Sequence, residues 1–362
     1  MRSMFDNGAL SGRAKLLPRL NLLVSYAYLR TGRKNGNQTQ FEELMLALAP
    51  YADVLVDSGA FTDFTETRNA LAAGTQYTPI SVDEYIDACK LYRGKVWQYI
   101  MLDVIENAVA SRQNLDRMVA AGLRPMPVFV YPESPDIVPE LVDINPYICV
   151  PGGVEGRLQF VRQRYQVAYT KSDGRARIHG LGFVRHPDMF RLPLASVDSS
   201  SWCSGGRFGN VSYYAPRTGF TSLHWREITQ ERKPALWRHL QRCGITPSTL
   251  SDPNMYSRIY SIPALTQTFA YMQLHQHCYQ HGMRYFFSIP TIHWTRQLLC
   301  VVASVDDKTN AFDYHKARSL YMNIHDLTKK DFASFLKWSI AVLSTCTDWQ
   351  TEIRLKQESV GA

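Results

Sequence analysis

Short apolar runs alternate with helix-like segments over the first two hundred residues of the chain. Most of these runs are continuously apolar, which is typical of strands buried on both faces of a parallel sheet. The segments between them repeat apolar residues at the spacing of amphipathic helices. The predicted strands are 22–28, 54–57, 96–103, 126–131, 147–150, 178–183 and 194–198, and the predicted helices between them are 40–49, 81–91 and 111–121.

Two of these helices carry boundary signals. Ser81 precedes Glu84 by three residues, the spacing of a capping box, so we expect a helix to begin directly after Ser81. Gly122 follows the third helix at the position where a left-handed glycine ends many helices.

The alternation predicts an α/β fold. Seven strand-helix units without a glycine-rich dinucleotide loop after the first strand favour a (β/α)8 TIM-like barrel with insertions over an open doubly wound sheet. The pattern does not place the eighth strand. After Trp202 the alternation gives way to a helix-rich C-terminal region, with long helices predicted over 262–283 and 329–343. We therefore expect the main part of the barrel in residues 1–210 and a remainder that completes it in residues 211–362.

Composition narrows the class of protein. A chain of 362 residues is too long for a short binding module. Its formal charge of +8 favours polyanionic partners, nucleic acid first among them. Seven scattered cysteines, an odd number, fit reduced thiols. The first 13 residues lack an apolar signal region and no stretch is apolar enough to span a bilayer, so we expect a cytoplasmic protein that does not bind membranes.

Three acidic residues follow predicted strands directly: Asp57, Asp103 and Asp198. Strand ends of a parallel barrel converge at one face, so the three carboxylates should meet there. One could act as a nucleophile and another could transfer protons. Each acid taken alone could instead cap the next helix or turn. Three acids in register favour the catalytic interpretation, and we expect an enzyme.

Five motifs in order along residues 20–210 resemble those of the tRNA-guanine transglycosylase superfamily, most of all its phage and bacterial members that insert 7-deazaguanine bases into DNA. The resemblance rests on Asp57-Ser58-Gly59-Ala60-Phe61, on Asp103 after the helix start at Ser81, on Pro151-Gly152-Gly153, on His179-Gly180-Leu181-Gly182 and on Ser196-Val197-Asp198-Ser199.

The resemblance implies a base-exchange reaction catalysed by a pentosyltransferase. Asp198 would attack the sugar C1′ of a guanosine in a polynucleotide, displace guanine and form a covalent glycosyl-enzyme intermediate. A free 7-deazaguanine base, such as a preQ0-like one, would then attack the same carbon. Asp57 would serve as general acid and base for the two bases. This chemistry is that of a retaining glycosidase.

The resemblance also implies a base pocket and a nucleic-acid surface. Asp103 would accept hydrogen bonds from the purine N1 and N2 donors, and backbone amides of the glycine turn would donate to O6. The other base-binding positions of the motifs are Ser58, Phe61, Gly152, Gly153, His179 and Gly180, with Phe61 and His179 on the two faces of the base. The glycine-rich stretch after Asp198 contains residues whose side chains are suited to contact phosphate and sugar: Arg207, Arg217, Tyr213 and Tyr214.

The chain departs from the family in its final third. The family's zinc-binding pattern of three cysteines and a histidine is absent, so we expect no metal and no cofactor. A second group, His275, His277, Cys278 and His281, is either a zinc site or a polar helix face toward nucleic acid. Pro151 removes a backbone donor before Gly152, and His179 replaces an apolar stacking residue. The changes at Pro151 and His179 bear on which purine analogue is accepted. The missing zinc pattern and the divergent final third favour DNA over tRNA as the substrate, in a host cytoplasm if the enzyme is phage-encoded, and relatives of this kind are commonly dimers, so this chain could form a homodimer.

Two other interpretations remain open. Paired carboxylates at a barrel face also serve glycosidases that act on saccharides or nucleosides. Alternatively the chain binds nucleic acid without catalysis, through its helical C-terminal third with Lys329 and Lys330.

Overall fold

The computed structural model describes residues 15–31, 39–152, 158–228, 231, 233–251, 262–306 and 309–347. The chain divides into two compact units. We call them the sheet unit, Asn21–Ser200 with Gln280–Thr291, and the helical unit, Met1–Leu20 with Ser201–Tyr279 and Ile292–Ala362. The division falls after Ser200 rather than at the expected residue 210, and a short segment from the C-terminal third returns to the sheet unit.

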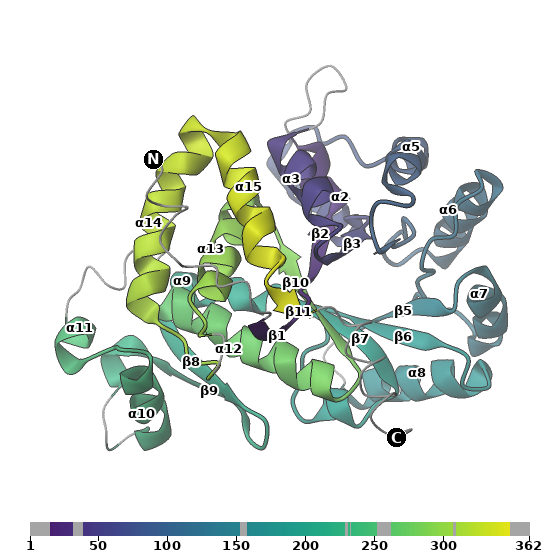
Figure 1. Cartoon of the computed structure of the whole chain (residues 1–362). Coiled ribbons are helices and arrows are strands. Elements are labelled where there is room, and N and C mark those ends of the chain that lie inside the picture. The colour runs from purple at the N-terminus through teal and green to yellow at the C-terminus, as the bar shows by residue number, and fades with distance from the viewer. Residues whose placement is uncertain are drawn as a thin grey trace, which may run out of the picture. The chain divides into compact units, whose positions relative to one another are not determined.

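The sheet unit is built on seven parallel strands in the order β4-β3-β2-β10-β7-β6-β5, which curl into a half-barrel (Figure 1). This confirms the predicted α/β class. The strands are β2 (Asn21–Ser25), β3 (Asp53–Asp57), β4 (Gln98–Tyr99), β5 (Tyr147–Pro151), β6 (Arg177–Leu181), β7 (Leu194–Ser199) and β10 (Arg284–Ile289). Every inner residue of β3 and β5 is buried, as the continuous apolar runs predict.

The predicted strand over 126–131 is present only as two parallel bridges. Ile100 pairs with Met126, and Val128 pairs with Cys149 of β5. Pro127 lies between these bridges and has no N–H to donate, although its carbonyl accepts from Cys149 at 2.7 Å. The proline therefore interrupts the ladder that the apolar run predicts.

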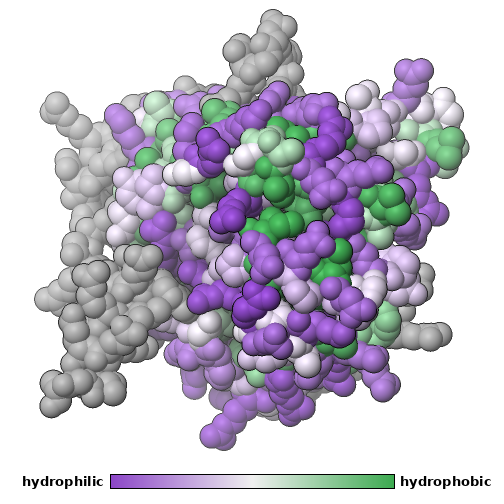
Figure 2. Space-filling view, turned by 90° about the vertical axis from the view of Figure 1, so that its right-hand side faces the viewer, coloured by the Kyte–Doolittle hydropathy of each residue, from purple (hydrophilic) through white to green (hydrophobic). Residues whose placement is uncertain are grey.

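Helices follow most strands of the sheet unit and pack beside them. They are α2 (Tyr26–Arg30), α3 (Gln40–Leu48), α4 (Ala60–Ala73), α5 (Val82–Tyr92), α6 (Ala108–Ala120), α7 (Val138–Ile144) and α8 (Leu158–Lys171), with short 3-10 turns at Pro135–Ile137 and Asp188–Phe190. The face toward which α5 to α8 lie in Figure 1 is largely hydrophilic, with apolar side chains gathered near its middle (Figure 2).

Both predicted helix boundaries are confirmed. Ser81 Oγ accepts from the Glu84 N–H at 3.1 Å and caps α5. Gly122 has φ of +78° directly after α6. The predicted strand over 22–28 is too long, because β2 ends at Ser25 and α2 begins at the next residue.

The end of the sheet where the strands begin is filled by aromatic and charged side chains. The Trp97 ring lies 5.2 Å from that of Phe286, and the Arg284 guanidinium lies 5.0 Å from the Trp97 ring. Arg284 also donates to Asp53 at 3.2 Å. This packing closes the amino-terminal end and leaves the carboxyl-terminal end of the strands for chemistry.

The helical unit contains most of the long helix α12, and most side chains of this helix are buried. Its elements are β1 (Lys15–Pro18), a turn at Ser201–Cys203, α9 (Gly205–Phe208), β8 (Asn210–Ala215), β9 (Gly219–His224), a turn at Trp225–Glu227, α10 (Pro234–Arg242), α11 (Pro247–Ser251), α12 (Ile262–Gln280), α13 (Ile292–Ala303), α14 (Tyr314–Lys330), α15 (Phe332–Leu343) and β11 (Cys346–Thr347). β8 and β9 form an antiparallel hairpin, and β1 pairs with β11.

The two long C-terminal helices were predicted with wrong boundaries. The helix over 329–343 is in fact the end of α14 and the whole of α15, separated at Asp331, whose carboxylate accepts from the Ser334 N–H at 3.0 Å. The helix over 262–283 stops at Gln280, and β10 follows it. In the described part of the chain, no helix is long and apolar enough to span a bilayer. All seven cysteines are free thiols.

Candidate functional site

The three acids named from the sequence lie at or just beyond the carboxyl ends of three strands of the sheet. Asp57 ends β3, Asp103 lies four residues after β4, and Asp198 is the penultimate residue of β7. They are close enough for their charges to interact. Asp198 helps to raise the pKa of Asp57, and Asp57 helps to raise that of Asp103. The predicted convergence is therefore present.

Asp198 is held by donors on both carboxylate oxygens. The backbone N–H of Gly182 donates to Oδ1 at 2.7 Å, and the Ser288 hydroxyl donates to Oδ2 at 2.8 Å. The side chain is only 11% exposed. The two donors come from different strands and loops, so they fix the orientation of this side chain.

Asp57 is placed to exchange protons near neutral pH. Burial, and after it the charge of Asp198, raise the pKa of Asp57 to about 6. The Gly59 N–H acts in the opposite direction, because it donates to the Asp57 Oδ2 at 3.0 Å. Gly59 has φ of +86°, and a Cβ there would lie 2.7 Å from the Ala27 Cβ and 2.9 Å from its backbone N. Only glycine fits this turn, so Gly59 fixes the backbone that holds Asp57.

Asp103 is the third acid, and its proton affinity is raised further. Burial, followed by the Asp57 charge, raises the pKa of Asp103 to about 7. The nearby Arg112 acts in the opposite direction. A carboxyl with this pKa is ionised above neutral pH and can then accept hydrogen bonds from a bound ligand.

The Asp103→Asn variant is expected to be more stable than the wild type at pH 8 and equally stable at pH 4. Because the folded pKa of about 7 lies above the unfolded value of 3.8, the stability that Asp103 contributes at low pH is lost as pH rises through 7. Asparagine has no charge to desolvate, so we expect the free energy of unfolding at pH 8 to rise by about 1 to 2 kcal/mol. This is less than the full value of about 1.4 kcal/mol for each unit of pKa shift, because water reaches part of the side chain.

Thermal unfolding at both pH values measures this effect, with Asp87→Asn as the control because that side chain is 79% exposed. Equal melting temperatures for Asp103→Asn and the wild type at pH 8 would contradict the expected desolvation of Asp103.

The structure corrects the role expected for His179. This residue is fully buried on β6, so it cannot lie on the face of a bound base. Its Nδ1 lies 2.8 Å from the Ser196 Oγ, and its Nε2 lies 3.4 Å from Asp198 Oδ1. The order Ser196, His179, Asp198 resembles a serine hydrolase triad, but Ser196 is also fully buried and no substrate could reach it.

The glycines of the motifs allow close packing rather than offering free backbone N–H groups to a ligand. The Gly152 N–H donates to the Leu181 carbonyl at 2.8 Å, so it is not free for a base O6, contrary to the expected role. A Cβ at Gly152 would lie 2.6 Å from that of Phe183, and one at Gly180 would lie 3.0 Å from the Tyr165 hydroxyl. Gly153 lies outside the described residues.

Phe61 is exposed and lies close to Asp57 in sequence. It lies in the first turn of α4, four residues after Asp57, and is 72% exposed. Ser58 is fully buried, and its Oγ accepts weakly from the Ala60 N–H at 3.4 Å at the start of that helix. An exposed aromatic ring at a strand end is suited to stacking on a base.

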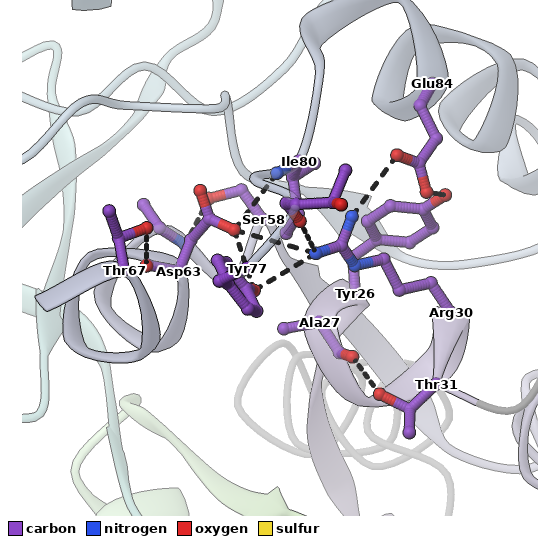
Figure 3. Close-up of polar contacts among 12 residues, drawn as sticks. Tyr26, Ala27, Arg30, Thr31, Ser58, Asp63, Thr67, Tyr77, Ile80 and Glu84 are labelled. Atoms are coloured by element: carbon purple, nitrogen blue, oxygen red, sulfur yellow. Dashed lines mark hydrogen bonds and ion pairs between the residues drawn. The ribbon is translucent and has the colours of Figure 1, made fainter. Parts of the chain in front are cut away.

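A polar network holds α4 to its neighbours (Figure 3). Asp63 of α4 accepts from the Tyr77 hydroxyl at 2.9 Å and from the Ile80 N–H at 3.0 Å. Arg30 of α2 donates to the same hydroxyl at 3.0 Å and approaches Glu84 of α5 at 3.4 Å. Ala60 is the buried residue of α4, so apolar packing contributes little to holding this helix. We infer that the polar network does much of the work of fixing the helix that carries Phe61.

The four residues expected to contact nucleic acid lie in the helical unit and differ in exposure. Arg217 is exposed in the turn between β8 and β9. Tyr213 is partly exposed and stacks on His239 with ring centres 5.2 Å apart. Tyr214 is 3% exposed and hydrogen-bonds His277, so it belongs to the core and its expected role is wrong. The side chain of Arg207 lies outside the described part.

Among the described residues, no group of three His, Cys, Asp or Glu side chains is placed to hold a metal ion. The alternative zinc group is divided by the end of α12 at Gln280, so His281 does not share a helix face with His277. His277 is bonded to Tyr214, and the His281 ring lies 4.9 Å from that of Phe190.

The sequence did not single out Ser288 or Ser196. Ser288 lies on β10, the strand that the pattern failed to place, although Gly282 and Pro290 bound its aromatic run as turn residues bound a strand. Ser196 was noticed only as part of the motif that contains Asp198.

No protein-family model matches this chain, and a search of curated proteins finds no match.

Proposed function

We propose that this protein is a base-exchange transglycosylase that replaces guanine in DNA with a 7-deazaguanine base. The observation that carries the proposal is the unequal treatment of three neighbouring carboxyls. Asp198 accepts hydrogen bonds from two donors that fix its orientation, whereas burial and neighbouring charge raise the pKa values of Asp57 and Asp103 to about 6 and 7. Carboxyls in such different environments at one site serve separate roles as nucleophile, acid-base and ligand acceptor.

Each step balances with these groups alone. An Asp198 oxygen forms a bond to C1′ while the C1′–N9 bond breaks, and its electron pair leaves with guanine, which takes a proton from Asp57. The incoming base then loses its N9 proton to Asp57 and attacks C1′. The C1′–oxygen bond breaks and its electron pair returns to Asp198. Asp103 accepts from the N1 and N2 donors of either base.

We also propose that the sheet closes into a complete (β/α)8 barrel. The segment 126–128 supports closure because it bridges Ile100 next to β4 and Cys149 of β5, the two edges of the seven-stranded sheet. With β10 between β2 and β7, that segment would be the eighth strand. All three acids would then lie at the carboxyl-terminal face.

A polynucleotide substrate is favoured by the charge of the whole chain and by an exposed aromatic ring close to Asp57 in sequence, and the divergent final third of the chain favours DNA over tRNA. The formal charge of the chain is +8, and Phe61 presents an exposed ring four residues after Asp57. A target nucleotide must leave its stack to reach buried carboxylates, and an exposed aromatic ring supports such a base. The free thiols favour a reducing compartment such as the cytoplasm.

Base incorporation tests the proposal directly. The purified chain is incubated with labelled 7-deazaguanine and either a guanine-containing DNA duplex or tRNA, with the Asp87→Asn variant as a matched control for loss of an exposed acid. We expect label in DNA and a rate that falls steeply with salt. Label only in tRNA would move the proposal to tRNA modification. Hydrolysis of free nucleosides without incorporation would favour a nucleosidase and overturn it.

A further inference from the structure

We propose that His179 is a positioning residue that, with the Gly182 N–H, holds Asp198 Oδ1 as the non-attacking oxygen and leaves Oδ2 to bond C1′. This inference rests on the proposed function, since it assigns the two oxygens of its nucleophile. It comes from three contacts to one carboxylate and one unpaired buried nitrogen.

The His179 Nε2 needs explanation because it is buried with no hydrogen-bond partner among the described residues. The atom it approaches is Asp198 Oδ1, at 3.4 Å. Contacts of this kind are often long before substrate binds and shorten in the reacting complex. The nitrogen is therefore aimed at the nucleophile from a site that solvent does not reach.

Ser196 decides which imidazole nitrogen carries the proton. Its Oγ lies 2.8 Å from the His179 Nδ1, and either atom could donate. If the serine hydroxyl donates to Nδ1, the neutral ring carries its proton on Nε2 and directs it at Asp198. The opposite tautomer would set a nitrogen lone pair against a carboxylate, so the first arrangement is favoured.

The donors divide unequally between the two oxygens of Asp198. Oδ1 accepts from the Gly182 N–H at 2.7 Å, and the His179 Nε2 lies 3.4 Å from the same oxygen. Oδ2 accepts from the Ser288 hydroxyl, and we assign its other lone pair to C1′. In the covalent intermediate Oδ1 becomes the carbonyl oxygen, and its two donors stabilise the charge that returns when the carboxylate leaves.

The two half-reactions should therefore respond differently to loss of His179. Without the Nε2 donor, Asp198 becomes a poorer leaving group, while its attack on C1′ does not gain from that donor. We expect His179→Met to slow discharge of the covalent intermediate by about 10²-fold, the size of effect seen for a lost oxyanion donor. Formation should change much less, and the intermediate should accumulate.

Rapid quenching and denaturing electrophoresis measure the fraction of protein bound covalently to DNA in the steady state. We expect this fraction to rise in His179→Met, to return toward the wild-type value in His179→Gln, whose amide nitrogen can replace Nε2, and to stay unchanged in Ser212→Ala. The control removes the hydroxyl of Ser212, a buried serine of β8 whose Oγ hydrogen-bonds that of Ser222 on β9. Ser196→Ala should act like a milder His179→Met and have no further effect in His179→Gln.

A fall of the covalent fraction in step with activity in His179→Met would indicate a merely structural role and overturn the inference. If the wild type forms no adduct with any nucleic acid, the proposed function fails, and the assignment of Oδ2 to C1′ fails with it. The tautomer of His179 then tests separately whether His179 positions Asp198. Nitrogen-15 spectra of labelled histidine, assigned with His179→Gln, should show the Nε2-protonated ring shifting in Asp198→Asn. An Nδ1-protonated ring, or no shift, would overturn it.

Discussion

The Asp198→Asn variant is expected to lose base exchange by about 10⁴-fold or more, because its amide cannot form the bond to C1′ that stores the sugar between two bases. The substitution should leave the fold intact. The amide oxygen can still accept from the Gly182 N–H, and the Ser288 hydroxyl can accept from the amide nitrogen. Incorporation of labelled base and unfolding temperature, measured on the same preparation, separate the two effects.

Retained incorporation in a folded Asp198→Asn protein would remove this residue from the mechanism. A matched control is Asp87→Asn, which changes an acid that is 79% exposed and lies 3.7 Å from the Lys90 ammonium. We expect that variant to exchange bases at the wild-type rate.

The Asp57→Asn variant is expected to lose about 10² to 10⁴-fold in rate, the usual contribution of a general acid or base. Its effect on the pH profile is more specific. With a pKa of about 6, Asp57 is protonated below that pH and can supply the leaving guanine, and it is ionised above it and can accept the proton of the incoming base. In the wild type, formation of the intermediate should therefore decline above pH 6, whereas its discharge should rise.

Single-turnover measurements of each half-reaction between pH 5 and 8 should show both dependences in the wild type and neither in Asp57→Asn. Removing this charge should also lower the pKa of Asp103, because Asp57 is among the causes that raise it. A variant that keeps the wild-type pH profile would show that another group moves the protons.

Much of the sheet unit could be predicted from the sequence because its strands are short, apolar and bounded by turns. The acids at 57, 103 and 198 were found for the same reason, since each directly follows such a run. The strand β10 was missed because it pairs with β2 and β7 while more than eighty residues of helical chain separate it from β7. No local pattern encodes a partner at that distance.

Side-chain roles were harder to predict than elements. His179 and Tyr214 carry types suited to ligand contact, yet both are buried and bonded to Ser196 and His277 respectively. Residue type gives chemistry, whereas burial is set by neighbours from other strands and helices. The donor Ser288 could not be predicted before β10 was placed, because its role depends on the hydrogen bond that it donates to Asp198 Oδ2.

The most direct test of the account is to locate the covalent bond. The wild-type protein is incubated with guanine-containing DNA and no incoming base, quenched, digested with nuclease and trypsin, and examined by tandem mass spectrometry. We predict a deoxyribosyl adduct on the tryptic peptide of residues 192–207, at Asp198, and its loss when 7-deazaguanine is added before quenching. Base incorporation that proceeds with no adduct, or with an adduct on any other residue, would contradict the account.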